Sequence, residues 1–214
     1  MYIIPPFLIK LLHICEFIAL FFGLLKFKKI KNTYWKWFVF YLIYIFIYEL
    51  ISYYLKYGFK IKIGYYLSMV AIPIEFIFIY WLYAYKSLKN RKLFWVFTFL
   101  FLGSLFGEEI LNNSDFTFKS FNNTIGTFLL LILVILEFIR QIKSDRIIHF
   151  KSEKMFYINI GVILFYIGNM PFFGLYQIIL KHPSIWNNYY IYFMISNCVM
   201  YLLFAASFIW GKPK

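Results

Sequence analysis

Charged residues are scarce in this sequence: only 14% of its 214 residues are Asp, Glu, Lys or Arg. A soluble domain of similar length carries about a quarter charged residues and at most about half apolar ones. Here 63% of the residues are hydrophobic and the mean hydropathy is +0.73. One water-exposed globule of this size cannot bury so much apolar surface. The composition therefore excludes a soluble protein and predicts an integral membrane protein.

Acidic residues and cysteines are also few. Nine acidic residues stand against 22 basic ones, which gives a net charge of +13. In a membrane protein such charge sets orientation and attracts anionic lipid, so we expect the lipid bilayer as partner and disfavour nucleic acid. The two cysteines, Cys15 and Cys198, lie in apolar stretches without CxxC spacing. This pattern predicts buried free thiols and no structural disulfide.

The sequence lacks the residue patterns of known intramembrane enzymes. Of its three histidines, His149 and His182 lie in loops, and no H-E-x-x-H occurs, which excludes a three-histidine zinc site. No lysine lies in 187–210, so retinal cannot be bound as a Schiff base there. P-loop, dinucleotide-binding and G-x-S-x-G motifs are missing too. We therefore predict a protein that is not an enzyme, with no catalytic residues, no cofactor and no metal.

Apolar runs of about 17 to 25 residues predict helices that cross the hydrocarbon core, which is about 30 Å thick. Seven such runs occur, near 3–25, 34–55, 64–86, 93–110, 121–142, 156–180 and 187–210. The fourth is the shortest and ends in Glu108-Glu109. The segments between the runs are short and polar, without a linker long enough for a second domain. The predicted fold is all-α: a single seven-helix transmembrane domain covering 1–214.

Basic residues fall unevenly on the two sides of this topology. Sixteen lie on one side and five on the other, which places the N-terminus outside and the C-terminus in the cytoplasm. We expect the inner (cytoplasmic) membrane of a bacterium. The candidate contacts to lipid or to a cytoplasmic protein partner on the basic side are Lys26, Lys28, Lys29, Lys31, Lys89, Arg91 and Lys92.

Acidic residues within the predicted spans are the main functional signal. Glu75 lies nearest the middle of a span, directly after the run Pro73-Ile74, while Glu49 and Glu16 lie nearer the ends of theirs. A carboxylate within the membrane normally faces the bundle interior and finds a partner there. Pro73 and Pro171 predict kinks, since a proline frees a backbone carbonyl in a helix. Glu137, by contrast, falls near an interface and is predicted to be a solvated helix end.

Other polar residues lie at comparable depth. His13 precedes Glu16 by three residues, so both lie on one helix face. Asn169 and Asn197 lie near the middle of the last two spans. As a group, His13, Glu16, Glu49, Glu75, Asn169 and Asn197 form a candidate site for an ion or small ligand. The alternative is interhelical hydrogen bonding that only holds the bundle together, at about 0.6 kcal/mol per contact.

The layout resembles a group of orphan bacterial seven-span proteins of unassigned function. The resemblance rests on Pro73-Ile74-Glu75, Trp186, Asn197 and the final run Trp210-Gly211-Lys212-Pro213-Lys214. In size, basic charge and composition the chain is also similar to small multi-span accessory proteins encoded beside RNA-targeting CRISPR effectors. The second resemblance implies that the basic loops contact a nucleoprotein or anionic lipid.

Two hypotheses for function remain. In the first, the protein is a carrier, channel or receptor-like bundle with a polar site centred on Glu75. In the second, it is an accessory or regulatory membrane protein, defence-associated by resemblance, that acts through its basic cytoplasmic loops or by forming a homo-oligomer.

Overall fold

A computed structural model of the protein describes residues 6–57, 64–111, 120–144 and 150–212. Over these residues the fold is helical, and Glu153 and Lys212 form an isolated parallel bridge. The α-helices are α1 (Pro6–Leu25), α2 (Phe27–Ile30), α3 (Trp35–Tyr57), α4 (Gly64–Tyr80), α5 (Arg91–Leu111), α6 (Ser120–Lys143), α7 (Lys154–Val162), α8 (Met170–Gly174), α9 (Tyr176–Ile179) and α10 (Pro183–Trp210). Two π-helical segments, η1 (Trp81–Ser87) and η3 (Ile163–Ile167), continue α4 and α7.

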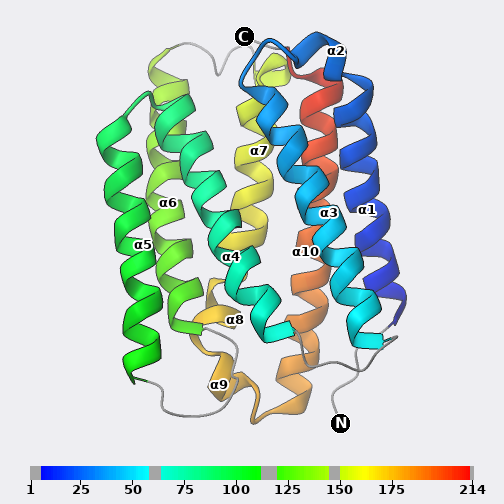
Figure 1. Ribbon diagram of the computed structural model, residues 1–214, viewed down its shortest axis with the longest axis vertical. Coiled ribbons are helices and arrows are strands. Elements are labelled where there is room, and N and C mark those ends of the chain that lie inside the picture. Colours follow the sequence, from blue (N-terminus) through cyan, green and yellow to red (C-terminus); the bar gives the residue numbers. More distant parts are fainter. Residues whose placement is uncertain (1–5, 58–63, 112–119, 145–149, 213–214) are drawn as a thin grey trace.

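The long helices run up and down along one common axis (Figure 1). Successive helices run in alternating directions, in the order α1, α3, α4 with η1, α5, α6, α7 with η3 and α8, and α10. α1 begins at one end of the bundle and α10 ends at the other. Proline at the first helical position suits the start of α10, because Pro183 has no N–H to leave unpaired. That helix therefore starts earlier than the apolar run near 187–210 predicts.

Among the described residues, five helical segments are long and apolar enough to cross a membrane: Phe7–Leu25, Trp35–Leu55, Phe121–Lys143, Lys154–Gly174 and Pro183–Trp210. α4 and α5 are not among them. An all-helical fold with several helices of this kind indicates an integral membrane protein.

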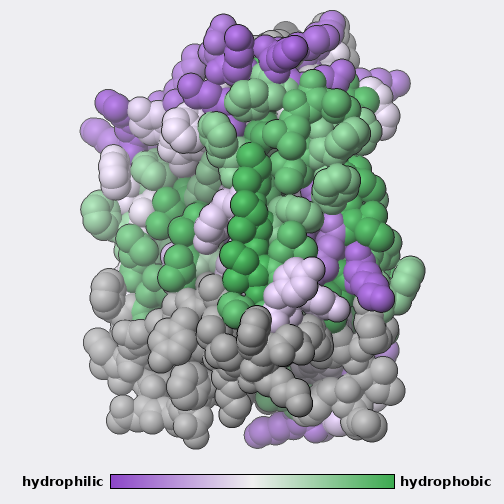
Figure 2. Space-filling view, turned by 45° about the vertical axis from the view of Figure 1, so that its right-hand side comes forward, coloured by the Kyte–Doolittle hydropathy of each residue, from purple (hydrophilic) through white to green (hydrophobic). Residues whose placement is uncertain are grey.

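The surface of the bundle supports the same conclusion. Large apolar side chains are exposed on its flanks, among them Phe17, Phe99, Leu100 and Ile142. Figure 2 shows hydrophobic side chains over the middle of the molecule and hydrophilic ones over one end. Patches of this extent on a protein surface mark contact with a membrane or another protein. Here the exposed apolar side chains belong to several helices, among them α1, α5 and α6, and on the face shown in Figure 2 they cover the middle of the molecule.

The tightest packing joins the two ends of the chain. α10 packs against α1 and α7 more extensively than any other helices contact each other. Gly161 on α7 allows the approach, since a Cβ there would lie 3.3 Å from backbone and side-chain atoms of Met200 on α10. On the opposite side, Gly126 on α6 lies directly against the rings of Phe76 and Phe101. Small residues at such positions are typical of helix contacts within membranes.

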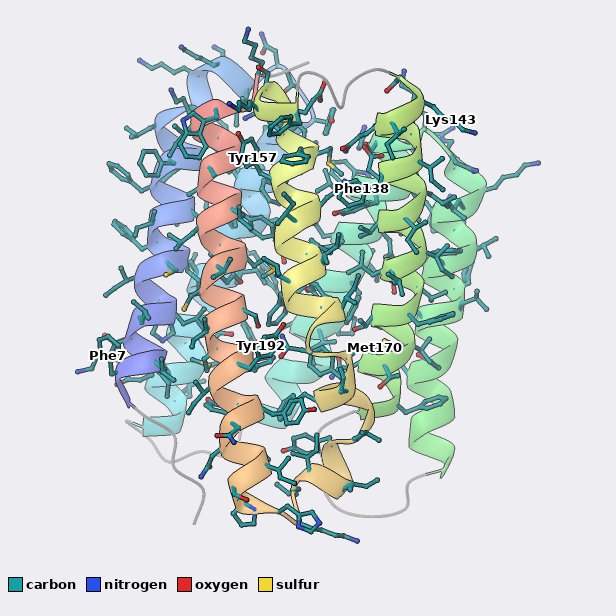
Figure 3. The ribbon with its side chains drawn as sticks, turned by 180° about the vertical axis from the view of Figure 1, so that it is seen from behind. Phe7, Phe138, Lys143, Tyr157, Met170 and Tyr192 are labelled. Carbon is teal, nitrogen blue, oxygen red and sulfur yellow. The ribbon has the colours of Figure 1, made fainter. Side chains whose placement is uncertain are left out.

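The two prolines act differently. α4 continues through Pro73 without interruption. At Pro171 the helix is interrupted: η3 ends at Ile167, and α8 restarts at Met170 with Pro171 in its first turn. Figure 3 shows this break, with Met170 after it and Tyr192 of α10 beside it. The Tyr192 hydroxyl donates a hydrogen bond of 3.3 Å to the Leu164 carbonyl, one of the backbone groups near the break.

Candidate functional site

The His13–Glu16 pair lies on the face of α1 that is turned toward the bundle. His13 Nδ1 is 3.3 Å from Glu16 Oε2, and the Glu16 side chain is only 2% exposed. The histidine ring also makes an edge contact with Tyr53 of α3, at 5.6 Å between ring centroids. The helical spacing of three residues therefore brings the two groups together as the sequence predicts.

A cavity of about 280 Å³ lies between α1, α3 and α10, directly beside this pair. Its polar lining consists of His13 from α1, Glu49, Ser52 and Tyr53 from α3, and Tyr190 and Asn197 from α10. Its apolar lining includes Phe193 and Met194. Three of the predicted site residues, His13, Glu49 and Asn197, thus share one cavity although they lie far apart in the sequence.

Three polar atoms at this cavity have no hydrogen-bond partner among the described residues. They are His13 Nε2, Ser52 Oγ and Asn197 Oδ1, and all three are buried. Buried polar groups in proteins are nearly always paired, so each such exception calls for a ligand or water. With Nδ1 directed at Glu16, His13 Nε2 is an acceptor when the ring is neutral and a donor when it is protonated.

The region is rich in carboxylates. Glu16 and Glu75 both lie within electrostatic reach of Glu49. Among the described side chains, His13 is the only basic group that acts on Glu16 and Glu49, and no basic group acts on Glu75. Uncompensated negative charge within a low-dielectric bundle is unfavourable unless a proton or another cation neutralises it.

Glu75 lies outside the cavity lining. The Tyr166 hydroxyl, on η3, donates a hydrogen bond to Glu75 Oε1. The Tyr41 hydroxyl of α3 also faces this carboxylate but completes no hydrogen bond there. The hydrogen bond from Tyr166 gives the Glu75 carboxylate a protein partner and connects α4 to η3. The structure therefore centres the polar site on His13 and Glu49, whereas the sequence centres it on Glu75.

Asn169 is also separate from the cavity. Its side chain is fully buried at the helix break, where Nδ2 donates to Ser196 Oγ at 2.8 Å and to the Phe165 carbonyl at 2.5 Å. These bonds join the end of η3 to α10. For Asn169 the geometry favours interhelical hydrogen bonding, the alternative to a ligand site that the sequence leaves open.

The burial of Glu137 is not predicted by the sequence. The residue is predicted as a solvated helix end, but its side chain is 0% exposed. Arg140 Nη2 lies 2.8 Å from Glu137 Oε1, and Gln141 Nε2 lies 3.0 Å from the same oxygen. Arg140 also donates to the carbonyl and the hydroxyl of Ser87 at the end of η1. The spacing of Glu137, Arg140 and Gln141 on one helix face is the signal that could have revealed this network.

The predicted lipid or partner contacts gather at one end of the bundle, the end where α10 finishes (Figure 1). Lys28 and Lys29 lie in α2, and Lys26 and Lys31 lie directly before and after it. Lys89 lies between η1 and α5, and Arg91 and Lys92 are the first two residues of α5. All are exposed except Lys26, which is partly buried. Arg91 Nη2 donates a hydrogen bond of 3.0 Å to the Tyr85 hydroxyl, and the guanidinium group of Arg91 lies over the Tyr85 ring.

In the part of the chain that the structure describes, no group of three or more His, Cys, Asp or Glu side chains is placed to hold a metal ion. The fold and the cavity define the class: a helical membrane protein with a polar cavity inside its bundle. Comparison with known protein families, curated proteins and solved structures finds no match to this chain. The resemblances stated from the sequence therefore stay predictions.

Proposed function

We propose that the protein is a non-enzymatic membrane protein that binds a small organic cation in the cavity between α1, α3 and α10. The observation that carries the proposal is the meeting of Glu49, His13 Nε2 and Asn197 Oδ1 at one cavity, with two of these atoms unpaired. A carrier or a receptor-like protein needs such a site, because its ligand must exchange hydration for fixed polar partners.

The carboxylates favour a ligand that carries positive charge. Glu49 lies at the cavity, and Glu16 and Glu75 act on it electrostatically. His13 can balance only one of these charges, and only when protonated. A cation bound beside Glu49 relieves the repulsion among the remaining carboxylates.

The size and the aromatic lining favour an organic cation over a bare ion. The cavity of about 280 Å³ is several times the volume of about 30 Å³ that one water molecule takes up. Tyr53, Tyr190 and Phe193 line it. Aromatic rings attract ammonium groups through cation–π interactions worth about 2 kcal/mol or more when desolvated.

Glu49→Gln tests the proposal, and Glu75→Gln is its matched control. Purified protein in detergent is heated with methylammonium, tetramethylammonium, Na⁺ or K⁺ at equal ionic strength. An organic cation should raise the thermal midpoint of the wild type more than Na⁺ or K⁺, because ligand binding stabilises the folded state. The shift should disappear in Glu49→Gln and persist at a smaller size in Glu75→Gln, whose carboxylate is bonded to Tyr166 and acts on Glu49 only electrostatically. Equal shifts in all three proteins would contradict the proposal.

Uptake by proteoliposomes separates a carrier from a receptor-like protein. Radiolabelled methylammonium should accumulate in liposomes containing the wild type when the membrane potential is negative inside, if the protein is a carrier. Binding that depends on Glu49 without uptake would assign a receptor-like role instead. Glu49→Gln liposomes provide the baseline for both results.

We also propose that α4 with η1 and α5 cross the membrane, giving seven spans in the inner membrane of a bacterium, with the N-terminus outside. The alternating directions of the helices support seven spans (Figure 1). The gathering of basic residues at the end where α10 finishes supports the orientation, since positive charge stays on the cytoplasmic side.

A second candidate function is an accessory role through the basic end. Lys28, Lys29 and Lys31 are exposed, and none forms an ion pair among the described residues. Replacing Lys26, Lys28, Lys29 and Lys31 by Gln should then weaken binding to a cytoplasmic protein partner in pull-down experiments. Retention of every partner by this variant would count against the accessory role.

A further inference from the structure

A second pocket, far from the cavity described above, lies at the basic end of the bundle. It measures about 280 Å³ and is bounded by the start of α3, the end of η1, the end of α6, the start of α7 and the segment after α10. Its charged lining consists of Lys86, Lys89, Arg140, Lys154 and Lys212, with Glu153 as the only acidic residue among the described lining.

Lys154 is the unusual member of this set. Its side chain is only 2% exposed, and among the described residues no acidic side chain forms an ion pair with its ammonium group. Nζ donates to the Ser207 carbonyl at 2.9 Å and lies 4.9 Å from the ring centroid of Phe208. An ammonium group has three donors, and one backbone carbonyl leaves two of them for a ligand. A buried cation without a counter-ion is unfavourable, so a bound anion would stabilise the charged form of Lys154.

Arg140 and Lys86 are held in place around the same pocket. Arg140 is fixed by Glu137 and Ser87, yet its buried Nε has no hydrogen-bond partner. Lys86 Nζ lies over the rings of Trp81 and Tyr85, at 5.1 Å and 4.9 Å from their centroids. These contacts limit the freedom of both side chains, which lowers the entropy lost when they bind a ligand.

We propose that this pocket binds a phosphate group, carried either by an anionic phospholipid or by a small soluble phosphate. Guanidinium and ammonium groups from separate elements are the side chains that recognise phosphate oxygens. The start of α7 at Lys154 adds backbone N–H groups and a favourable helix dipole. Trp35 also lines the pocket, and tryptophan is enriched at the depth of lipid headgroups.

Lys154→Met and Lys86→Gln test the pocket, with Lys28→Gln as the matched control. Lys28 is exposed on α2 and does not line the pocket, so its loss changes net charge equally. Inorganic phosphate is titrated into detergent-solubilised protein at constant ionic strength, and the thermal midpoint is followed. The apparent Kd should rise about tenfold in Lys154→Met, as expected for the loss of one charge-assisted hydrogen bond. Lys86→Gln should weaken binding by a smaller factor, and Lys28→Gln should bind like the wild type.

Lipid binding is measured on the same pocket variants. Protein reconstituted into phosphatidylcholine vesicles with or without phosphatidylglycerol is extracted, and retained lipid is counted by native mass spectrometry. Retention of phosphatidylglycerol by the wild type and by Lys143→Gln, whose exposed lysine lies outside the pocket, but not by Lys154→Met, assigns the phosphate to a lipid. A phosphate response without lipid retention assigns it to a soluble ligand.

Two outcomes would overturn the proposal. One is a wild type that neither responds to phosphate nor retains phosphatidylglycerol. The other is a response that Lys28→Gln weakens as much as Lys154→Met and Lys86→Gln do, because such a response reports diffuse charge rather than this pocket.

Discussion

His13 Nδ1 lies 3.3 Å from Glu16 Oε2, while the other nitrogen of the same ring, Nε2, is buried without a hydrogen-bond partner. The two residues are one helical turn apart on α1. Glu16 thus fixes the orientation of the imidazole, as carboxylates that accept from the second ring nitrogen do for metal-binding histidines elsewhere. Only His13 reaches the cavity, where Glu49 faces it from α3. The pair therefore separates two roles, with Glu16 orienting the ring and His13 presenting its free nitrogen.

His13→Leu should destabilise the protein by about 1–3 kcal/mol, because it leaves the buried Glu16 carboxyl without its partner. The double variant His13→Leu with Glu16→Leu should recover most of this loss, since both polar groups are then removed. Unfolding by SDS in mixed micelles, followed by helical circular dichroism, gives the free energies. A double variant as unstable as the single one would show that the pair does not stabilise the fold.

Arg140→Met should cost about 3 kcal/mol in the same measurement. The substitution leaves the fully buried Glu137 with only Gln141 as a partner and cuts the two hydrogen bonds from α6 to Ser87. Lys143→Met removes the same charge from an exposed position three residues later and should change stability by less than about 0.5 kcal/mol. Similar losses in both variants would mean that net charge, rather than the buried pair, is responsible.

The contrast between Glu16 and Glu137 shows that the sequence predicts contacts within one helix but not burial by other helices. Helical spacing is local, so the pairing of His13 with Glu16 follows directly from three residues of separation. Burial depends on neighbouring helices. Glu137 lies near the end of α6, and its partner Arg140 reaches across to Ser87 at the end of η1. Lys154 is similar, because the segment after α10 returns over it through the Glu153–Lys212 bridge.

The helical limits follow from hydropathy, but their irregularities do not. The apolar run near 156–180 predicts one helix, whereas the chain forms α7, η3, α8 and α9 in turn. Pro171 signals an interruption, yet nothing in the apolar pattern places a π-helical segment before it. That segment carries Tyr166, whose hydroxyl donates a hydrogen bond to Glu75, and Glu75 does not line the cavity. π-Helical segments inside α-helices often occur at functional positions.

Gly126→Ala should destabilise the protein by about 1–3 kcal/mol, whereas Gly103→Ala should not. A Cβ at Gly126 would lie 2.9 Å from ring atoms of Phe76 and Phe101, so α6 would have to move away from α4 and α5. At Gly103 on α5, a Cβ would meet nothing within 4 Å. Alanine there should stabilise the helix by up to about 1 kcal/mol. Equal effects of the two variants on SDS unfolding would contradict the packing of α6 against these rings.

Thiol labelling distinguishes seven spans from five, and Lys89→Cys is the deciding position. If only the five helices that meet the length and hydropathy limits cross, α4 and α5 do not, and residue 89 lies outside with Lys181. If α4 with η1 and α5 also cross, residue 89 lies inside with Lys28. In a Cys15→Ala, Cys198→Ala background, an impermeant maleimide should label Lys181→Cys in spheroplasts, but label Lys28→Cys and Lys89→Cys only after lysis. Labelling of Lys89→Cys in intact spheroplasts would refute seven spans, and labelling of Lys28→Cys there would refute the orientation.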